Sequence, residues 1–404
     1  MRIAGWAIAV LVAAVAALAG VQLTRAVPAP SATINSTIAA DQPGGTGFSW
    51  PSARESAVTV AGLDESWQSG DQREVPIASV TKMMTAYIVL SDHPLTGGAQ
   101  GPSITVSTVA WKTYKSDADN DDSNAKVAAG EILTERQALE ALLLPSADNI
   151  ADLLADWDAG SMSAFAAKMN QRARALGMND TRYTDPSGLA ASTVSTARDQ
   201  LILVRKVMAI PAFADIVKLP SATIPVAGTI ENYNYETGED GIIGVKTGTD
   251  SAAGGCWAFA VKRAVAGAQR VEYGVVLGAP PRSRSALALA NAALSAGLSL
   301  ANDVPKKIRR MTVLPAGTQV GTITVAWSPT PVPVVTASAL SGLAVSGTTI
   351  SLHPDAQAPG SSFGSGDRVG EVSVTGLIGG SRSVPLITHG ASGSAPLTWR
   401  LFRS

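Results

Sequence analysis

The feature that most constrains this chain is an apolar stretch from Ile77 to Leu90 that opens with a hydroxyl and an amine. Pro76 precedes the stretch and no Gly or Pro interrupts it, so the pattern predicts a helix. On a helix, Ser79 and Lys82 share one face about one turn apart. An amine placed there can take the proton of the hydroxyl if burial or a second cation keeps the amine neutral. The spacing therefore favours a nucleophilic serine with an amine base, although a capping serine followed by an exposed lysine gives the same pattern.

The composition limits the kinds of binding partner and metal site that the chain can have. The 404 residues are enough for two or three domains, and 46% apolar with 16% charged residues predicts globular structure with a substantial core. A net charge of −1 gives no basic excess for binding nucleic acid. The single cysteine, Cys256, excludes an internal disulfide framework, and the three scattered histidines match no zinc-ligand spacing. The cysteine count thus excludes a multi-thiolate metal site, and if the chain is a serine enzyme, the placement of the histidines favours an amine as its base.

The first 25 residues resemble an export segment. Residues 4–23 carry no charge, which suits either a signal peptide, cleaved near Ala17-Leu18-Ala19, or a retained membrane anchor. Either outcome places the rest of the chain outside the cytoplasm, as a secreted or membrane-anchored protein of the cell envelope. Residues 26–54 are rich in Pro, Ala, Ser, Thr and Gly, and we expect a flexible linker there.

Two further segments place polar residues beside predicted secondary structure. Residues 91–124 are predicted to form a turn-rich loop. A helix is predicted after Thr134, with Thr134 and Gln137 in a capping box, and Pro145 ends it. Residues 146–149, Ser-Ala-Asp-Asn, then open a second helix, either as a simple connection with a Ser146 cap or as a polar lip of a cleft. From Met311 onward, short β-branched runs alternate with turns, which predicts an all-β module.

Three short motifs occur in order along the chain: Ser79-x-x-Lys82, Ser146-Ala147-Asp148-Asn149 and Lys246-Thr247-Gly248-Thr249. Such an ordered set is the signature of β-lactamases and penicillin-binding proteins. The sequence is similar to the D-alanyl-D-alanine carboxypeptidase family, whose Gly-x-Lys-Thr-Gly strand and later Ala-Gly-x-Cys are matched at 244–248 and 253–256. The resemblance implies an α+β, penicillin-binding/β-lactamase-like domain over residues 55–303, with an antiparallel sheet and helices. A small all-β domain over 311–404 would follow.

The resemblance also implies a reaction. Ser79 would attack a D-Ala-D-Ala peptide bond of a peptidoglycan stem peptide and form an acyl-enzyme. Lys82 would act as the base, and Ser146 would pass a proton to the leaving amine. β-Lactam antibiotics would inhibit such an enzyme, and no cofactor is implied.

The third motif would bind the substrate. Lys246 and Thr247, with Thr249, would hold the terminal carboxylate, and Gly248 would leave room for the backbone of the ligand. The backbone N–H groups of Ser79 and Thr249 would surround the oxyanion.

The second motif departs from the family pattern Ser-x-Asn, because Asp148 stands at the Asn position and Asn149 follows. An ionised Asp cannot donate a hydrogen bond, opposes a substrate carboxylate and holds Lys82 charged. Either Asn149 takes over in substrate binding or Asp148 stays protonated. A catalytically weak or silent peptidoglycan-binding scaffold, and a β-lactamase or endopeptidase on the same fold, therefore remain as alternatives. Relatives often carry a C-terminal amphipathic anchor helix, and the last residues here are too short for one, so we expect membrane attachment through residues 4–23.

Overall fold

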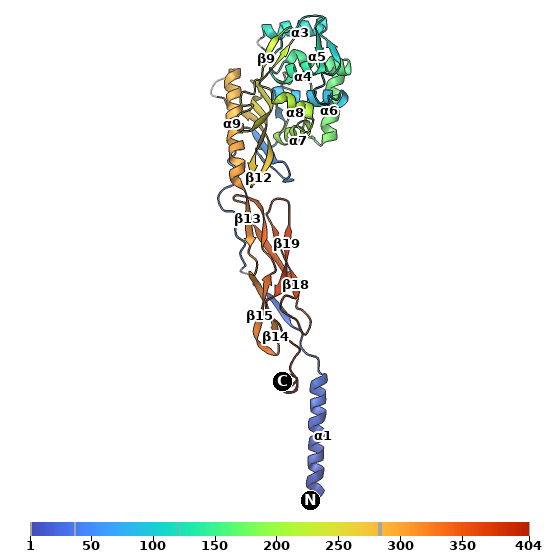
Figure 1. The fold of residues 1–404 in the computed structure, drawn as a ribbon, viewed down its shortest axis with the longest axis vertical. Coiled ribbons are helices and arrows are strands. Elements are labelled where there is room, and N and C mark those ends of the chain that lie inside the picture. The colour runs from blue at the N-terminus through green and yellow to red at the C-terminus, as the bar shows by residue number, and fades with distance from the viewer. Residues whose placement is uncertain (1, 36–37, 121, 282–284, 404) are drawn as a thin grey trace. The chain divides into compact units, whose positions relative to one another are not determined.

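The computed structural model describes residues 2–35, 38–120, 122–281 and 285–403. They form two compact units, one of residues 48–307 and one that joins residues 1–47 to residues 308–404 (Figure 1).

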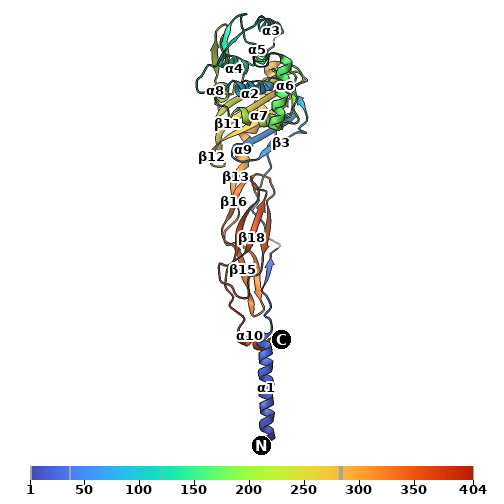
Figure 2. The same ribbon diagram turned by 90° about the vertical axis from the view of Figure 1, so that its right-hand side faces the viewer.

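The larger unit is built on a five-stranded antiparallel sheet in the order β10-β11-β12-β2-β3. Helix α9 packs on one face and helix α7 on the other (Figures 1 and 2). Because both faces are covered, every residue of β2 is buried. The strands are β2 (Glu55–Val60), β3 (Ser66–Ser69), β10 (Ile242–Asp250), β11 (Gly254–Val265) and β12 (Ala268–Ala279), and short pairs are β4 (Val75–Pro76) with β7 (Val194–Ser195), β5 (Ser103–Thr105) with β6 (Ile132–Thr134), and β8 (Ser221–Ile224) with β9 (Gly228–Glu231).

Helix α2 (Lys82–Asp92) runs through the core of this unit, where Met83, Met84 and Ile88 are fully buried. The predicted helix from Ile77 is only partly confirmed, because a 3₁₀ turn, η1 (Ala78–Thr81), precedes α2. Ala78 has a left-handed φ of 47°, which turns the chain before the helix begins. The other helices are α3 (Thr108–Asp119), α4 (Glu135–Leu143), α5 (Asp148–Ala159), α6 (Met162–Leu176), α7 (Ala197–Val207), α8 (Pro211–Val217) and α9 (Ala286–Lys307).

The capping box at Thr134 and Gln137 is confirmed at the start of α4. The prediction of a loop over residues 91–124 is wrong for α3, which begins after Ser107. The Ser107 hydroxyl accepts a hydrogen bond from the Ala110 N–H and caps the helix, a local signal that the clustered acids obscured.

The smaller unit contains a six-stranded sheet in the order β1-β14-β15-β19-β18-β17 and a separate β13-β16 pair. Its core is apolar, with Ile323, Val372 and Leu386 fully buried. Its elements are α1 (Arg2–Thr24), β1 (Ser31–Ile34), β13 (Ile308–Leu314), β14 (Gln319–Val325), β15 (Ser328–Thr336), β16 (Leu340–Val345), β17 (Ser351–Ala356), β18 (Arg368–Thr375), β19 (Arg382–Thr388) and α10 (Leu397–Phe402).

The flexible linker predicted over residues 26–54 is wrong for part of that range. Strand β1 pairs antiparallel with β14. The Gln42 side chain then accepts a hydrogen bond from the Ile350 N–H and donates one to the Ile350 carbonyl, each at 2.9 Å. Backbone pairing therefore fixes a segment whose composition alone resembles a tether.

Helix α1 is long and apolar enough over Gly5–Thr24 to cross a membrane, with a mean hydropathy of 2.3. A signal sequence meets the same criterion.

Candidate active site

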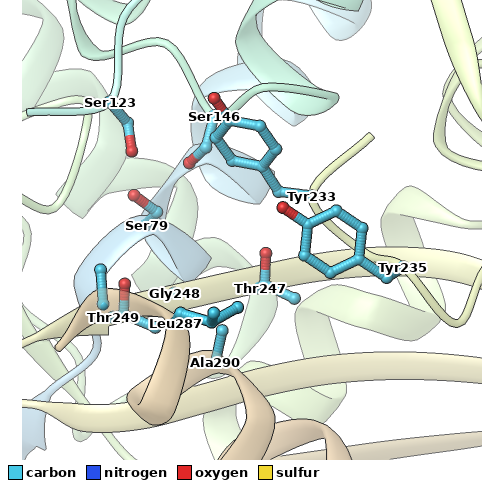
Figure 3. Close-up of a pocket in the computed structure, with 11 residues that line it drawn as sticks. Ser79, Ser123, Ser146, Tyr233, Tyr235, Thr247, Gly248, Thr249, Leu287 and Ala290 are labelled. Atoms are coloured by element: carbon cyan, nitrogen blue, oxygen red, sulfur yellow. The ribbon is translucent and has the colours of Figure 1, made fainter. Parts of the chain in front are cut away.

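A pocket of about 190 Å³ opens in the larger unit (Figure 3). Residues from η1, from the loop after α3, from the turn before α5, from the segment between β9 and β10, from strand β10 and from helix α9 form its walls. They are Ser79, Ser123, Ser146, Tyr233, Tyr235, Thr247, Gly248, Thr249, Ala286, Leu287 and Ala290.

Strand β10 passes very close to the 3₁₀ turn that carries Ser79. A Cβ atom placed on Gly248 would lie 2.9 Å from the backbone nitrogen of Ser79 and 3.0 Å from that of Val80. Glycine is thus the residue that lets the strand approach the turn. The approach brings Thr247 and Thr249 to the same pocket as the half-buried Ser79 (Figure 3).

The buried amine of Lys82 donates three hydrogen bonds, which is all an ammonium can give. Its partners are the Ser79 hydroxyl at 2.8 Å, the Asp148 carboxylate at 2.5 Å and the Ser187 carbonyl at 2.9 Å. The side chain of Lys82 is inaccessible to solvent. One fully buried nitrogen therefore links the hydroxyl to a carboxylate.

A tight turn over residues 185–189 supplies the carbonyl that Lys82 contacts. One Asp185 carboxylate oxygen accepts hydrogen bonds from the Ser187 hydroxyl and from the backbone N–H groups of Gly188 and Leu189. Gly188 has a φ of 86°, and a Cβ there would overlap the carbonyl oxygen of Ala78. The turn therefore packs directly against η1.

The second motif divides between the pocket and the protein interior. Ser146 lines the pocket with a left-handed φ of 65°, and its buried hydroxyl has no hydrogen-bond partner among the described residues. Asp148 contacts Lys82 and is absent from the pocket wall. The Asn149 amide pairs with both backbone groups of Ala125, at 3.0 and 2.9 Å. The interpretation of Asn149 as a substrate-binding residue is therefore wrong for this geometry, because its amide is already used to hold the loop beside Ser123.

Lys246 also lies behind the pocket wall. It is 1% exposed, and its amine donates a hydrogen bond to the Thr247 carbonyl at 2.9 Å. Burial, and secondarily the nearby charge of Lys82, lower the pKa of Lys246 well below its usual value, while Asp148 opposes that shift.

Comparison with known proteins identifies the larger unit. The sequence profile of the peptidase family described as D-alanyl-D-alanine carboxypeptidase matches residues 68–281, which is more than half of the chain. The chain belongs to this family. The predicted family, the α+β fold class and the assignment as a serine-type D-alanyl-D-alanine carboxypeptidase are thereby confirmed.

Individual relatives agree. The D-alanyl-D-alanine carboxypeptidase DacB2 of Mycobacterium tuberculosis is 32% identical over 243 residues, 58% of this chain and 72% of that protein. A D-alanyl-D-alanine endopeptidase of Pseudomonas aeruginosa is 35% identical over 125 residues, 31% of this chain and 37% of that protein.

Among solved structures, the Streptomyces K15 DD-transpeptidase matches with a TM-score of 0.53 and 26% identity, over 62% of this chain and 96% of that one. The carboxypeptidase DacD of Francisella tularensis matches with a TM-score of 0.58 over 89% of this chain and 98% of that one. At 20% identity, the DacD likeness concerns the fold alone.

Sequence reasoning missed several residues of this carboxypeptidase-family site. Tyr233 and Tyr235 line the pocket, 40% and 60% exposed, with ring centroids 6.4 Å apart. The Tyr233 N–H donates to the Leu144 carbonyl at 3.0 Å, which ties this segment to the turn before Ser146. The alternating Asn-Tyr-Asn-Tyr at 232–235 was the available signal, because two aromatic side chains two residues apart lie on one side of an extended segment.

Two further carboxyl groups, those of Asp117 and Asp152, interact electrostatically with the Lys82–Asp148 pair. Burial raises the pKa of Asp117 to about 6 and that of Asp152 to about 7, with smaller contributions from neighbouring carboxylates, Asp148 included. The Lys82 charge acts in the opposite direction on both groups. The Lys82 amine therefore interacts with a cluster of acidic residues rather than with Asp148 alone.

Proposed function

We propose that Ser79 is the nucleophile of a reaction that removes the terminal D-alanine from peptidoglycan stem peptides. The observation that carries this proposal is the 2.8 Å contact between the Lys82 amine and the Ser79 hydroxyl at the wall of a pocket that also contains Ser146. A nucleophile, a base within hydrogen-bond reach and a second hydroxyl are the groups that acyl transfer requires.

In the acylation step, the Ser79 oxygen forms a bond to the carbonyl carbon of the penultimate D-alanine, and its proton passes to the neutral amine of Lys82. The oxyanion accepts hydrogen bonds from the backbone N–H groups of Ser79 and Thr249, each worth about 3–4 kcal/mol of barrier stabilisation. The C–N bond then breaks, the leaving amine receives a proton through Ser146, and D-alanine departs. Water hydrolyses the resulting ester and restores the serine.

The substrate carboxylate binds at the Thr247 and Thr249 hydroxyls, which face the pocket. Lys246 acts from behind the strand as a positive charge. An arriving carboxylate favours the protonated amine and so offsets the burial that lowers the pKa of Lys246. Tyr233 and Tyr235 provide an apolar wall for the peptide, on the side of Ser146 from which D-alanine departs.

Helix α1 acts in this proposal as a retained membrane anchor that keeps the enzyme at the cell envelope. Ser79, the same serine that attacks the peptide, forms an acyl-enzyme with β-lactam antibiotics.

The carboxypeptidase test is release of D-alanine from a peptide ending in D-Ala-D-Ala. We expect release by the wild type and a loss of at least about a thousand-fold in Ser79→Ala. Ser123→Ala, which removes a neighbouring hydroxyl of the same pocket, is the control and keeps most of the activity. Equal release by wild type and Ser79→Ala would contradict the proposal.

A second candidate, endopeptidase action, is favoured by the relative that bears that name. Cleavage of a cross-linked stem-peptide dimer faster than release of D-alanine would select it. The third candidate, a silent scaffold, is motivated by Asp148 beside Lys82. It predicts peptide binding without D-alanine release, and gain of release in Asp148→Asn.

A further inference from the structure

Helix α10, of six residues, packs against the C-terminal end of α1 within the smaller unit. The guanidinium of Arg403 donates hydrogen bonds to the main-chain carbonyls of Gln22, Arg25 and Ala26, at 3.0, 2.6 and 3.0 Å. Arg400 donates to the carbonyl of Leu23. The last carbonyls of a helix lack intrahelical donors, so these two arginines satisfy the end of α1 and fix α10 beside it.

Arg25, Arg400 and Arg403 gather positive charge at this end of α1. The acceptors are neutral carbonyls, and among the residues that the structure describes no carboxylate forms an ion pair with Arg25, Arg400 or Arg403. The Nε atoms of Arg400 and Arg403 are buried and have no hydrogen-bond partner there. A groove of about 480 Å³ beside them is lined by Arg25, Ala26, Pro28, Ala326, Trp399, Phe402 and Arg403.

Large apolar side chains stand next to these charges. Leu397 is 64% exposed and Phe402 is 85% exposed, both on the helix that touches α1. The Trp399 ring lies under the Arg403 guanidinium at 5.2 Å and near the Trp327 ring at 6.0 Å. Exposed apolar side chains, tryptophan and arginine together are the composition of segments that lie at a membrane–water interface.

We propose that Arg25 and residues 397–403, here termed the collar, lie in the phospholipid headgroup layer where α1 leaves the bilayer. The groove binds the phosphate of an anionic phospholipid, and Phe402 enters the acyl boundary. Hydrogen bonds between α10 and the end of α1 require that the collar lie at the height where the span ends, close to Thr24. This inference rests on the proposed retention of α1 as an anchor, but it is independent of the chemistry at Ser79.

The test places a probe on Phe402 in the full chain. Cys256 is the only cysteine, it is fully buried, and burial raises its pKa to about 12, so Phe402→Cys is labelled selectively with a nitroxide. Ala316→Cys is the control, because Ala316 is exposed and lies before the first residue of β14. Trp327, which is near the Trp399 ring, follows the other end of this strand, and seven strand residues span about 23 Å. Both are reconstituted in nanodiscs of phosphatidylcholine, with or without about one third phosphatidylglycerol.

We expect oxygen, which concentrates in lipid, to relax the nitroxide at 402 more than a water-soluble nickel chelate does, and the reverse at 316. Phosphatidylglycerol should raise the oxygen-to-nickel ratio at 402 by roughly two-fold or more. Arg400→Gln with Arg403→Gln should abolish that gain, whereas Arg309→Gln with Arg310→Gln, two exposed arginines of β13, should keep it.

The collar proposal is wrong if the probe at 402 is as accessible to nickel as the probe at 316. It is also wrong if the oxygen-to-nickel ratio at 402 does not change with phosphatidylglycerol. D-Alanine release from the same discs reports the catalytic proposal separately, so its absence together with a buried probe overturns the chemistry and supports the collar. Intact mass of the protein from native membranes checks the anchor, since loss of the first 25 residues overturns both anchor and collar.

Discussion

The Lys82 amine lies 2.5 Å from a carboxylate oxygen of Asp148 and 2.8 Å from the Ser79 hydroxyl. The carboxylate stabilises an ammonium, whereas deprotonation of Ser79 needs a neutral amine, so the two contacts oppose each other at the start of the reaction. Transfer of a proton from the Lys82 amine to the Asp148 carboxylate would leave both groups neutral and the net charge of the pair unchanged.

Asp148→Asn should remove the carboxylate that contacts the Lys82 amine at 2.5 Å and so favour the amine as a base. We expect the rate of acylation by a fluorescent penicillin to rise by roughly ten-fold. Asp156→Asn makes the same change at an exposed position of α5 and should leave the rate unchanged. An acylation rate that stays the same or falls in Asp148→Asn would show that the carboxylate does not restrain the amine.

Gly248→Ala should slow acylation by roughly a hundred-fold or more, because the added methyl lies 2.9 Å from the Ser79 nitrogen and pushes β10 away from η1. The measurement is the acylation rate, with the melting temperature recorded in parallel. Gly98→Ala is the matched control, because a Cβ there meets nothing within 4 Å. Acylation at the wild-type rate in Gly248→Ala would mean that the contact has no catalytic role.

The three motifs could be found in the sequence because each is local: a few residues at fixed spacing carry the chemistry, whatever lies between them. The pocket wall could not be found in this way. A backbone hydrogen bond to Leu144 ties Tyr233 to the turn before Ser146, and the Asp185 turn contacts Lys82 through the Ser187 carbonyl. Backbone groups carry no side-chain signal in the sequence. Asn149 was misread because the motif gives its position but not its direction.

The smaller unit shows the same limit. Ser31 contacts Thr324, which is 293 residues away, so no local pattern could separate strand β1 from a tether. The composition of residues 31–34 favours a linker, but these residues pair with the edge of β14 and form a strand. The all-β character from Met311 was readable because strand periodicity and turn residues are local signals.

Ser146→Gly should stabilise the folded protein and slow its acylation. Glycine adopts the φ of 65° without strain and removes a buried hydroxyl that has no partner among the described residues, so we expect a gain of about 1 kcal/mol in the free energy of unfolding. Loss of the proton relay should lower the acylation rate by roughly a hundred-fold. Ala266→Gly, in the hairpin after β11 with a φ of 51°, should gain stability without losing activity. Full activity in Ser146→Gly would remove the hydroxyl from the mechanism.

Glu272→Gln should flatten the pH dependence of stability. Glu272 is fully buried on β12, neither carboxylate oxygen has a partner among the described residues, and burial raises its pKa from 4.5 to about 8. Between these values the folded protein holds a proton that the unfolded chain releases, so the stability of the neutral acid is complete below about pH 4.5 and is lost as pH rises through about 8. In urea unfolding the wild type should lose up to roughly 1.4 kcal/mol per pH unit in this window from this group. Glu272→Gln should remove that slope, whereas Glu231→Gln at an exposed position of β9 should retain it; identical slopes in all three proteins would place the pH dependence elsewhere.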